Sequence, residues 1–226
     1  LVVWLWYDGT MLFCALFGVF GISFSLLLVT ERKERFSIAK ALHFLDFRKK
    51  TRVFKIFLFL FFMMGLAFGF VGGFVIPLFL DVNGFGAEVI GLIVGLQILL
   101  AGLFSYLFSK SSRMKKLILW SGILFSVVFL LLSFSSFVFA AVLTVVYGVA
   151  EGMSAIGQEG ILSKICGKES YGTDIGLLMM GLHIGETASL ALSGILIATW
   201  GFAAPFLLAA LTYVVFYVGS YLILQE

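Results

Sequence analysis

Long apolar runs, separated by short polar or charged segments, recur along the whole sequence. A helix needs about 20 residues to cross the roughly 30 Å hydrocarbon core of a membrane, and each run is about that long or longer. The runs are continuous and do not alternate with polar residues, which favours helices over the strands of a membrane barrel. The pattern predicts seven membrane-spanning helices, at about residues 3–29, 54–80, 86–109, 116–135, 137–163, 173–198 and 203–224.

Composition places the chain among integral membrane proteins. Hydrophobic residues make up 62% of the sequence and charged residues 12%, which lies outside the range of soluble domains. Cys14 falls in the first predicted helix and Cys166 at a helix end, so we expect no disulfide framework. We therefore predict an all-α membrane protein that contacts membrane lipids and has no nucleic-acid partner.

The positive charges predict the orientation of the helices. All fifteen Lys and Arg residues fall in or at the edges of the first, third and fifth connections between predicted helices. The other connections, DVNGFGAE, SFSS and TWGFAA, contain none. Because Lys and Arg are enriched in cytoplasmic loops, we expect a multi-pass protein of the cell membrane. Its N-terminal end is predicted to lie outside and its C-terminal end in the cytoplasm.

Three segments follow from this topology. We predict one membrane-spanning helix in residues 1–30, a cytoplasmic basic loop in residues 31–53, and a bundle of six helices in residues 54–226. The loop carries apolar residues at helical spacing, which predict a short helix in the headgroup layer: Ile38, Ala41, Leu42 and Leu45. The alternative is a solvated linker whose charges only fix the topology.

Glycines recur at the four-residue spacing that lets helices approach closely in a membrane. These are Gly65, Gly69 and Gly73; Gly91 and Gly95; Gly148 and Gly152; Gly172 and Gly176; and Gly181 and Gly185. The six helices of the bundle also divide into two triplets of similar pattern. They predict a three-plus-three repeat of the kind that transporters contain.

Four polar residues fall near the middle of the predicted spans: Gln97, Glu151, His183 and Glu186. A charged side chain at that depth costs about 2.5 to 3.5 kcal/mol on insertion scales, so such residues usually face a cavity or each other. We predict that these four side chains belong to a substrate or proton pathway.

Glu151 lies on a polar stripe along one face of the helix predicted at 137–163. The members of the stripe recur at helical spacing: Thr144, Tyr147, Glu151, Ser154 and Gln158. We expect Glu151 to point into a water-accessible cavity, where it carries a proton or meets a cationic group. The alternative is a structural glutamate that joins its helix to a neighbour through Gln97.

His183 and Glu186 are three residues apart and therefore lie on one helical face. The imidazole titrates near neutral pH, so the two side chains can form a proton-relay pair. The alternative is a structural hydrogen bond at a helix contact.

The connection from Ser105 to Lys116 carries a family resemblance. It resembles the cytoplasmic signature of the major facilitator superfamily, which reads Gly, three residues, Asp, Arg or Lys, one residue, Gly, and then basic residues. Serines stand at the Gly, Asp and second Gly positions: Ser105, Ser109 and Ser112. The positive charges are kept: Lys110, Arg113, Lys115 and Lys116.

A longer match lies in KESYGTDIGLLMMGLHIGETASLALSGILIATWGFAAPF, which resembles the eleventh-helix region of the same superfamily. The matching positions are Gly172, Gly176, Gly185, Ser193, Gly194, Gly201, Phe202 and Phe206. The resemblance covers most of residues 54–224. It implies that the chain contains the sixth helix, the central loop and the whole C-terminal six-helix half of such a fold.

The resemblance also implies a function. A member of this superfamily is a secondary active transporter that moves a small molecule by alternating access, with the helices at 54–80 and 137–163 lining the cavity. We expect proton-coupled efflux of apolar or drug-like compounds, and uptake of an organic solute is the alternative. The implied partners are a small-molecule substrate, protons and the N-terminal half of the transporter. Without that half we expect no transport.

Two other classes compete with a transporter. A seven-helix receptor shares the helix count, but the last predicted helix has no lysine for a retinal Schiff base and the external loops are very short. An intramembrane enzyme would use His183 and Glu186 as metal ligands or as an acid and a base. The sequence contains no HExxH or GxSxG motif and no cluster of metal ligands. We therefore expect no enzymatic activity, no cofactor and no metal.

Overall fold

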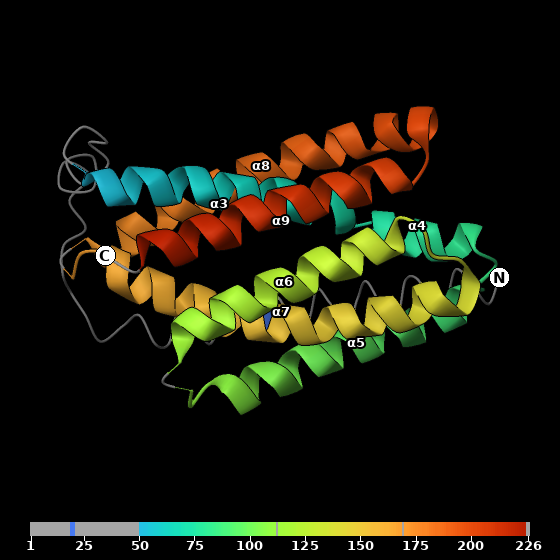
Figure 1. Cartoon of the computed structure of the whole chain (residues 1–226), viewed down its shortest axis with the longest axis horizontal. Helices are drawn as coiled ribbons and strands as arrows, with labels where there is room; N and C mark the ends of the chain where they lie inside the picture. The colour runs from blue at the N-terminus through green and yellow to red at the C-terminus, as the bar shows by residue number, and fades with distance from the viewer. Residues whose placement is uncertain (1–18, 21–49, 112, 169, 225–226) are drawn as a thin grey trace. The chain divides into compact units, whose positions relative to one another are not determined.

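The computed structural model describes residues 19–20, 50–111, 113–168 and 170–224. The chain divides into two compact units, Leu1–Leu42 and His43–Glu226, and the second unit carries helices α3 to α9 (Figure 1). The predicted span at 3–29 and the basic connection at 31–53 lie almost wholly outside the described residues.

Six segments of the described chain are long and apolar enough to cross a membrane. The first combines two helices, α3 (Arg52–Val71) and α4 (Val75–Val82). The other five are single helices: α5 (Ala87–Phe108), α6 (Met114–Leu132), α7 (Phe137–Ile165), α8 (Tyr171–Trp200) and α9 (Ala203–Ile223). They confirm the predicted all-α membrane fold and match the last six of the seven predicted spans.

The first described span is broken, whereas the sequence pattern predicted one continuous helix at 54–80. α3 ends at Val71, and Gly73 has a φ of +59°, a left-handed conformation that glycine adopts without strain. Pro77 lies in the first turn of α4, where its missing N–H leaves no hydrogen bond unmade. In a continuous helix the proline ring would clash with the carbonyl group of Gly73, so the helix breaks one turn before the proline.

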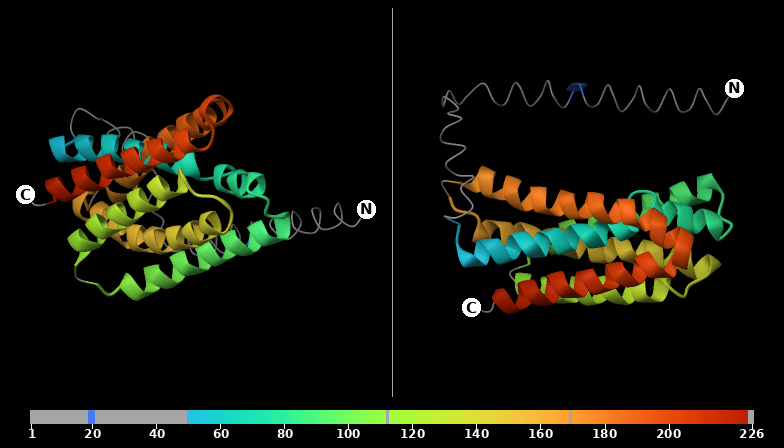
Figure 2. Two further views of the ribbon diagram at one scale, coloured as in Figure 1. Left: turned by 45° about the vertical axis from the view of Figure 1, so that its right-hand side comes forward. Right: turned by 90° about the horizontal axis from the view of Figure 1, so that it is seen from above.

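The helices pack in an order that differs from their order in the chain. From one edge of the bundle to the other this order is α8, α3, α9, α6, α7 and α5 (Figure 1). Figure 2 shows α8 and α9 on opposite sides of α3. α5 packs chiefly on α7, and only 6% of its most apolar stretch is buried. The two edge helices, α5 and α8, therefore keep broad outward faces.

The packing repeats itself within the bundle. Helices α3, α5 and α6 form one triplet, and α7, α8 and α9 form the second. The first helix of each triplet packs on the second and third helices of the other, so that α3 contacts α8 and α9 while α7 contacts α5 and α6. The third helices, α6 and α9, pack on each other. This arrangement is the one expected from the predicted three-plus-three repeat.

Small residues bring α3 and α8 into close contact. A Cβ atom on Gly65 would lie 1.9 Å from the carbonyl oxygen of Leu182, so the backbones touch there. The Ser193 hydroxyl donates a hydrogen bond to the carbonyl oxygen of Gly69 at 3.2 Å. Without a hydrophobic driving force between helices in lipid, such packing and hydrogen bonding hold them together. The predicted close contacts of four glycines are confirmed here: Gly65, Gly69, Gly181 and Gly185.

The contact between α5 and α7 is built in the same way. A Cβ atom on Gly148 would lie 2.1 Å from the carbonyl oxygen of Gln97, and one on Gly152 would lie 2.4 Å from that of Ala101. The Ser105 hydroxyl donates to the Gly152 carbonyl oxygen at 3.1 Å. Both glycines of this predicted pair therefore form a helix contact.

Other predicted glycine contacts are not made among the described residues. Four glycines on the edge helices have no neighbouring atom within 4 Å of an added Cβ: Gly91, Gly95, Gly172 and Gly176. They lie on α5 and near the start of α8, on faces that the described chain leaves open. The contacts that their four-residue spacing predicted are therefore not made by any helix of the described chain.

Aromatic rings fill the interior between α3, α6, α7 and α9. The Tyr213 ring stacks on Phe125 with a centroid distance of 4.4 Å and meets Phe68 edge to face at 5.9 Å. Phe125 also contacts Tyr147 of α7 at 5.5 Å. Each such pair contributes about 0.5 to 1.5 kcal/mol beyond the burial of its area. The rings join the two triplets at the centre of the bundle.

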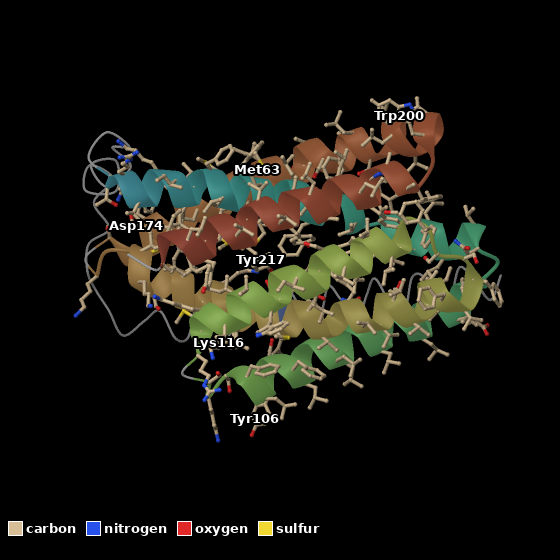
Figure 3. The ribbon with its side chains drawn as sticks, viewed as in Figure 1. Met63, Tyr106, Lys116, Asp174, Trp200 and Tyr217 are labelled. Carbon is tan, nitrogen blue, oxygen red and sulfur yellow. The ribbon has the colours of Figure 1, made fainter. Side chains whose placement is uncertain are left out.

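The described Lys and Arg residues lie at one end of the bundle, which holds the α5–α6 and α7–α8 connections and is called the basic end below. Figure 3 places Lys116 and Asp174 at this end and Trp200 at the other. The placement of Lys and Arg on one side, which the sequence predicted, is therefore present in the six described spans.

A buried ion pair ties two connections together at the basic end. Asp174 is 3% exposed and pairs with the ammonium group of Lys50. The same carboxylate accepts hydrogen bonds from the Gly167 N–H at 2.9 Å and the Ser170 hydroxyl at 2.7 Å. Removing one partner of a buried pair costs about 3 to 5 kcal/mol, because the other charge stays unpaired. The pair thus fixes the start of α3 against the α7–α8 connection.

The α3–α8 contact predicts a stability effect at Gly185. A Cβ atom there would lie 2.3 Å from the Phe62 carbonyl oxygen, so Gly185→Leu must push the two backbones apart. We expect a loss of about 1 to 3 kcal/mol, as for other overpacked positions. Unfolding of the purified protein in detergent measures it, with Ala191→Leu on the exposed face of α8 as the control. Equal stabilities of the two variants would contradict the close contact.

The basic end also predicts how Cys166 reacts. Burial raises the pKa of this thiol to about 11, and the charge of Asp174 acts in the same direction while that of Lys50 opposes it. Because the thiolate is the reactive form, we expect alkylation of native Cys166 to keep rising with pH up to about 11. The folded pKa exceeds the ordinary value of 9.0, so this group contributes stability that is lost as pH rises from 9 to 11.

Rates of alkylation by iodoacetamide in a Cys14→Ser background measure this pH dependence. The denatured protein is the control, since its thiol should reach a plateau near pH 9. A plateau near pH 9 in the native protein as well would show that the thiol is not shielded.

Candidate functional site

Glu151 is the middle residue of the 29-residue α7, and its direction follows from its neighbours on the helix. Gly148 faces α5, and Ser154 faces α9 through a hydrogen bond with Tyr217. Successive helical residues turn by about 100°, so Glu151 points about 60° from each of these directions. Gly157, which faces α6, lies about 120° away. The half-buried carboxyl group therefore points between α5 and α9, away from α6.

Gln97 holds the Glu151 carboxyl group from α5. Its side-chain amide donates a hydrogen bond to Oε2 of Glu151, and the glutamine itself is 8% exposed. This contact was predicted by the alternative interpretation of the sequence, in which Glu151 is a structural residue that joins its helix to a neighbour through Gln97. An amide donor serves a carboxylate and a neutral carboxyl group equally in geometry, because both offer an acceptor oxygen. The bond therefore fixes the position of Glu151 in either protonation state.

The rest of the polar stripe on α7 is satisfied inside the bundle. Ser154 shares a hydrogen bond with the Tyr217 hydroxyl of α9 and accepts one from the Gln158 amide at 2.8 Å. The Thr144 hydroxyl donates to the carbonyl oxygen of Ala140, one turn earlier, at 2.9 Å. Ser154 and Gln158 therefore belong to a network with α9, while Thr144 makes a local bond.

Tyr147 connects the stripe to the aromatic interior. Its ring contacts Phe125 at 5.5 Å and Phe129 at 5.2 Å, and the residue is 6% exposed. Glu151 lies one turn along α7 from this residue. Tyr147 therefore joins the polar stripe to the buried aromatic interior.

His183 and Glu186 form a pair on α8, as the sequence predicted. His183 Nδ1 lies 3.0 Å from Glu186 Oε2, and the side chains are 68% and 44% exposed. They lie off the face that α8 presents to α3. An open hollow of about 620 Å³ runs along this exposed side, lined by Met180, His183, Ile184, Thr187 and Ala188. The four predicted mid-depth groups therefore form two separate pairs, one on α5 and α7 and the other on α8.

The basic residues of the predicted cytoplasmic signature lie in the α5–α6 connection and in the first turn of α6, at the basic end. Lys110, Arg113 and Lys116 are exposed, and Lys115 is half-buried. The Arg113 N–H donates to the Ser111 hydroxyl at 3.3 Å and begins the turn into α6. This group keeps its positive charge in contact with solvent.

Polar residues of α9 were missed by the sequence analysis. Tyr213, Tyr217 and Ser220 lie on the buried face of this helix, and Tyr217 bonds to Ser154. Their spacing of four and three residues is the pattern that identified the stripe on α7, so the signal was present.

The geometry gives no metal centre within the described residues, where no group of three His, Cys, Asp or Glu side chains could hold an ion. A family model, Major Facilitator Superfamily, matches residues 57–226. The chain therefore belongs to the major facilitator superfamily of membrane transporters, whose members are in general not enzymes. A comparison with curated proteins finds no match to the chain.

The bond between Gln97 and Glu151 predicts a stability effect. Gln97→Leu leaves the half-buried carboxyl group without this donor, which costs about 1 to 3 kcal/mol for an unsatisfied buried group. Glu151→Gln keeps an acceptor for the Gln97 amide, so we expect a smaller loss. Chemical unfolding in detergent compares the two variants. Unchanged stability of Gln97→Leu would show that the bond contributes nothing to the fold.

Proposed function

We propose that the chain is part of a secondary active transporter that moves a small organic molecule by alternating access. The proposal rests on membership of the superfamily and on one observation about the site. Ionisable side chains lie near the middle of two membrane-spanning helices, and one pair of them is on an exposed face. Transporters of this kind place their substrate and ion sites near the bilayer midplane, at the boundary between repeats.

The exposed pair on α8 needs a polar environment. A charged residue at the bilayer centre costs about 2.5 to 3.5 kcal/mol on insertion scales, and lipid offers no compensating partner. His183 and Glu186 are 68% and 44% exposed in the described chain. Because lipid would not accept them there, we infer that this face of α8 lines an aqueous cavity or meets the other half of the transporter.

Glu151 is the proposed proton carrier. It is half-buried at the middle of α7 and bonded to one neutral amide, so it can gain or lose a proton while Gln97 keeps its position fixed. Alternating access would then expose the carboxyl group first to one side of the membrane and then to the other. The His183–Glu186 pair is proposed as a second proton site, because its imidazole and carboxyl groups lie 3.0 Å apart and can pass a proton between them.

The proposed substrate class is apolar or drug-like, and the proposed direction is efflux coupled to protons. The open hollow beside His183 on α8, which is also lined by Met180, Ile184 and Ala188, supports an apolar substrate. A site lined chiefly by apolar groups with one or two polar anchors suits such a ligand. The positive-inside rule supports an orientation across the cell membrane in which the basic end faces the cytoplasm.

The test uses the natural full-length protein in proteoliposomes with an imposed pH gradient and the apolar dye Nile red as probe. We expect gradient-driven movement of the dye, and we expect Glu151→Gln to abolish its dependence on pH. Glu186→Gln should shift that dependence, because it removes the partner of His183. Glu159→Gln, at an exposed position near the basic end, is the matched control.

If neither Glu151→Gln nor Glu186→Gln alters the pH dependence while both variants insert normally, these residues do not carry the coupling proton. If the unsubstituted protein moves no Nile red under any gradient, efflux of apolar compounds is the wrong substrate class.

A further inference from the structure

A line of polar groups runs between α7 and α9, here called the polar seam. Its members are Ser154 and the half-buried Gln158 on α7 and Tyr213, Tyr217 and Ser220 on α9. The three residues of α9 are at most 2% exposed and lie in a bundle interior that is formed chiefly by apolar and aromatic side chains. Figure 3 places Tyr217 between the two ends of the bundle.

The hydrogen bond between Ser154 and Tyr217 fixes the register of the seam. Both helices run toward the basic end, so positions equally far from this bond lie at similar depth. Tyr213 is one turn before Tyr217 and lies near the level of Glu151, which is three residues before Ser154. Gln158 and Ser220 are one turn after the bond. At a rise of about 1.5 Å per residue, the seam extends about 10 Å from the Glu151 level toward the basic end.

Two hydroxyl groups of the seam lack hydrogen-bond partners. Among the described residues, Tyr213 Oη and Ser220 Oγ are the buried side-chain oxygen or nitrogen atoms without one. Tyr213 lies close enough to Tyr147 for the two hydroxyls to influence each other, but the pair does not meet hydrogen-bond geometry. A buried polar group left unsatisfied costs about 1 to 3 kcal/mol, and water commonly satisfies such groups. The unpaired hydroxyls lie toward the two ends of the seam.

The other half of the same interior is closed by aromatic rings. Phe206 of α9 contacts Phe129 of α6 at 6.3 Å and Phe79 of α4 at 5.0 Å. These three residues are at most 6% exposed. Phenylalanine rings offer no hydrogen bond to water, whereas the half toward the basic end offers hydroxyl and amide groups. Away from the basic end the stripe on α7 continues with Tyr147 and with Thr144, whose hydroxyl is already bonded to the carbonyl oxygen of Ala140.

We propose that the polar seam is a hydrated path through which Glu151 exchanges protons with the basic side of the membrane. This path is separate from the open faces of α5 and α8, and its proton role rests on the proposed function of Glu151. A proton leaving the carboxyl group passes to a water oxygen in the path and emerges as hydronium at the basic end, leaving a carboxylate behind. The reverse passage restores the neutral acid.

The groups that face Glu151 are consistent with this path. On its own helix Tyr147 is the nearby titratable group, and on α9 Tyr213 and Tyr217 interact with its charge. α5 contributes the neutral amide of Gln97. From α6 the neighbouring interior residues are aromatic apart from the buried Ser121, whose hydroxyl donates to the carbonyl oxygen of Ile118. The lysines of that helix lie in its first turn at the basic end. The titratable groups around Glu151 are thus tyrosines, which stay neutral near physiological pH.

Water access to the seam is tested without any transport assay. In the natural full-length protein with its native cysteines replaced, Ser220→Cys and Ser154→Cys are exposed to 2-aminoethyl methanethiosulfonate added at the basic side. Leu178→Cys is the matched control, since Leu178 is 0% exposed in the corresponding half of α8 but lies among apolar side chains. Because thiol modification requires access of water and reagent, we expect the seam cysteines to react at least about tenfold faster.

A second measurement tests the proton role. The infrared carboxyl band lost in Glu151→Gln reports the Glu151 proton, and its exchange rate in D₂O can be followed directly. We expect Tyr217→Phe to slow this exchange several-fold, while Tyr106→Phe, on the exposed side of α5, leaves it unchanged.

Seam cysteines that react no faster than Leu178→Cys would overturn the hydrated path. If Ser154→Cys does not fold, Ser220→Cys decides that result alone. Unchanged proton exchange in Tyr217→Phe would overturn the proton role. Either failure leaves the proposed function standing if Glu151→Gln still abolishes pH dependence, because Glu151 would then receive its proton through the open face.

Discussion

The constraint on which this bundle depends is that lipid satisfies no hydrogen bond. Every polar side chain inside the membrane must therefore find a partner in the protein or in water that the protein admits. Ser189 and Ser193 meet it by bonding to backbone carbonyl oxygens within α8 and across to α3. Gln97 and Glu151 meet it by bonding to each other. His183 and Glu186 pair with each other on the open face of α8, whereas Ser220 has no hydrogen-bond partner among the described residues.

The same constraint explains the internal symmetry. Helices in lipid hold together through close packing, and that packing needs glycine or serine where backbones touch. The α3–α8 and α5–α7 contacts are equivalent under the three-plus-three repeat, and both place glycines against backbone carbonyl oxygens. The repeat also leaves the same kind of open, glycine-bearing face on α5 and α8.

Polar groups at the basic end and at the centre of the bundle have different partners. At the basic end the Asp174 carboxylate pairs with the Lys50 ammonium group and accepts hydrogen bonds from a backbone N–H and a hydroxyl group. Its charge is therefore satisfied by structural contacts. At the centre Glu151 has one neutral donor and aromatic surroundings, so its charge is not matched by a cation among the described residues. A carboxyl group without a fixed counter-ion is free to change its protonation state, as the proposed role of Glu151 requires.

The sequence by itself determined the spans, the charged end and the close helix contacts, because hydrophobic length, Lys and Arg placement and glycine spacing are local properties. It also determined the pairing of His183 with Glu186, since three residues on a helix fix that distance. Only the tertiary structure decided which helices meet: Gly148 has a partner while Gly91, equally placed in a four-residue pair, has none among the described residues. It alone brought Tyr217 to Ser154 across 63 positions, because such pairing depends on the order in which helices pack and not on periodicity along any one of them.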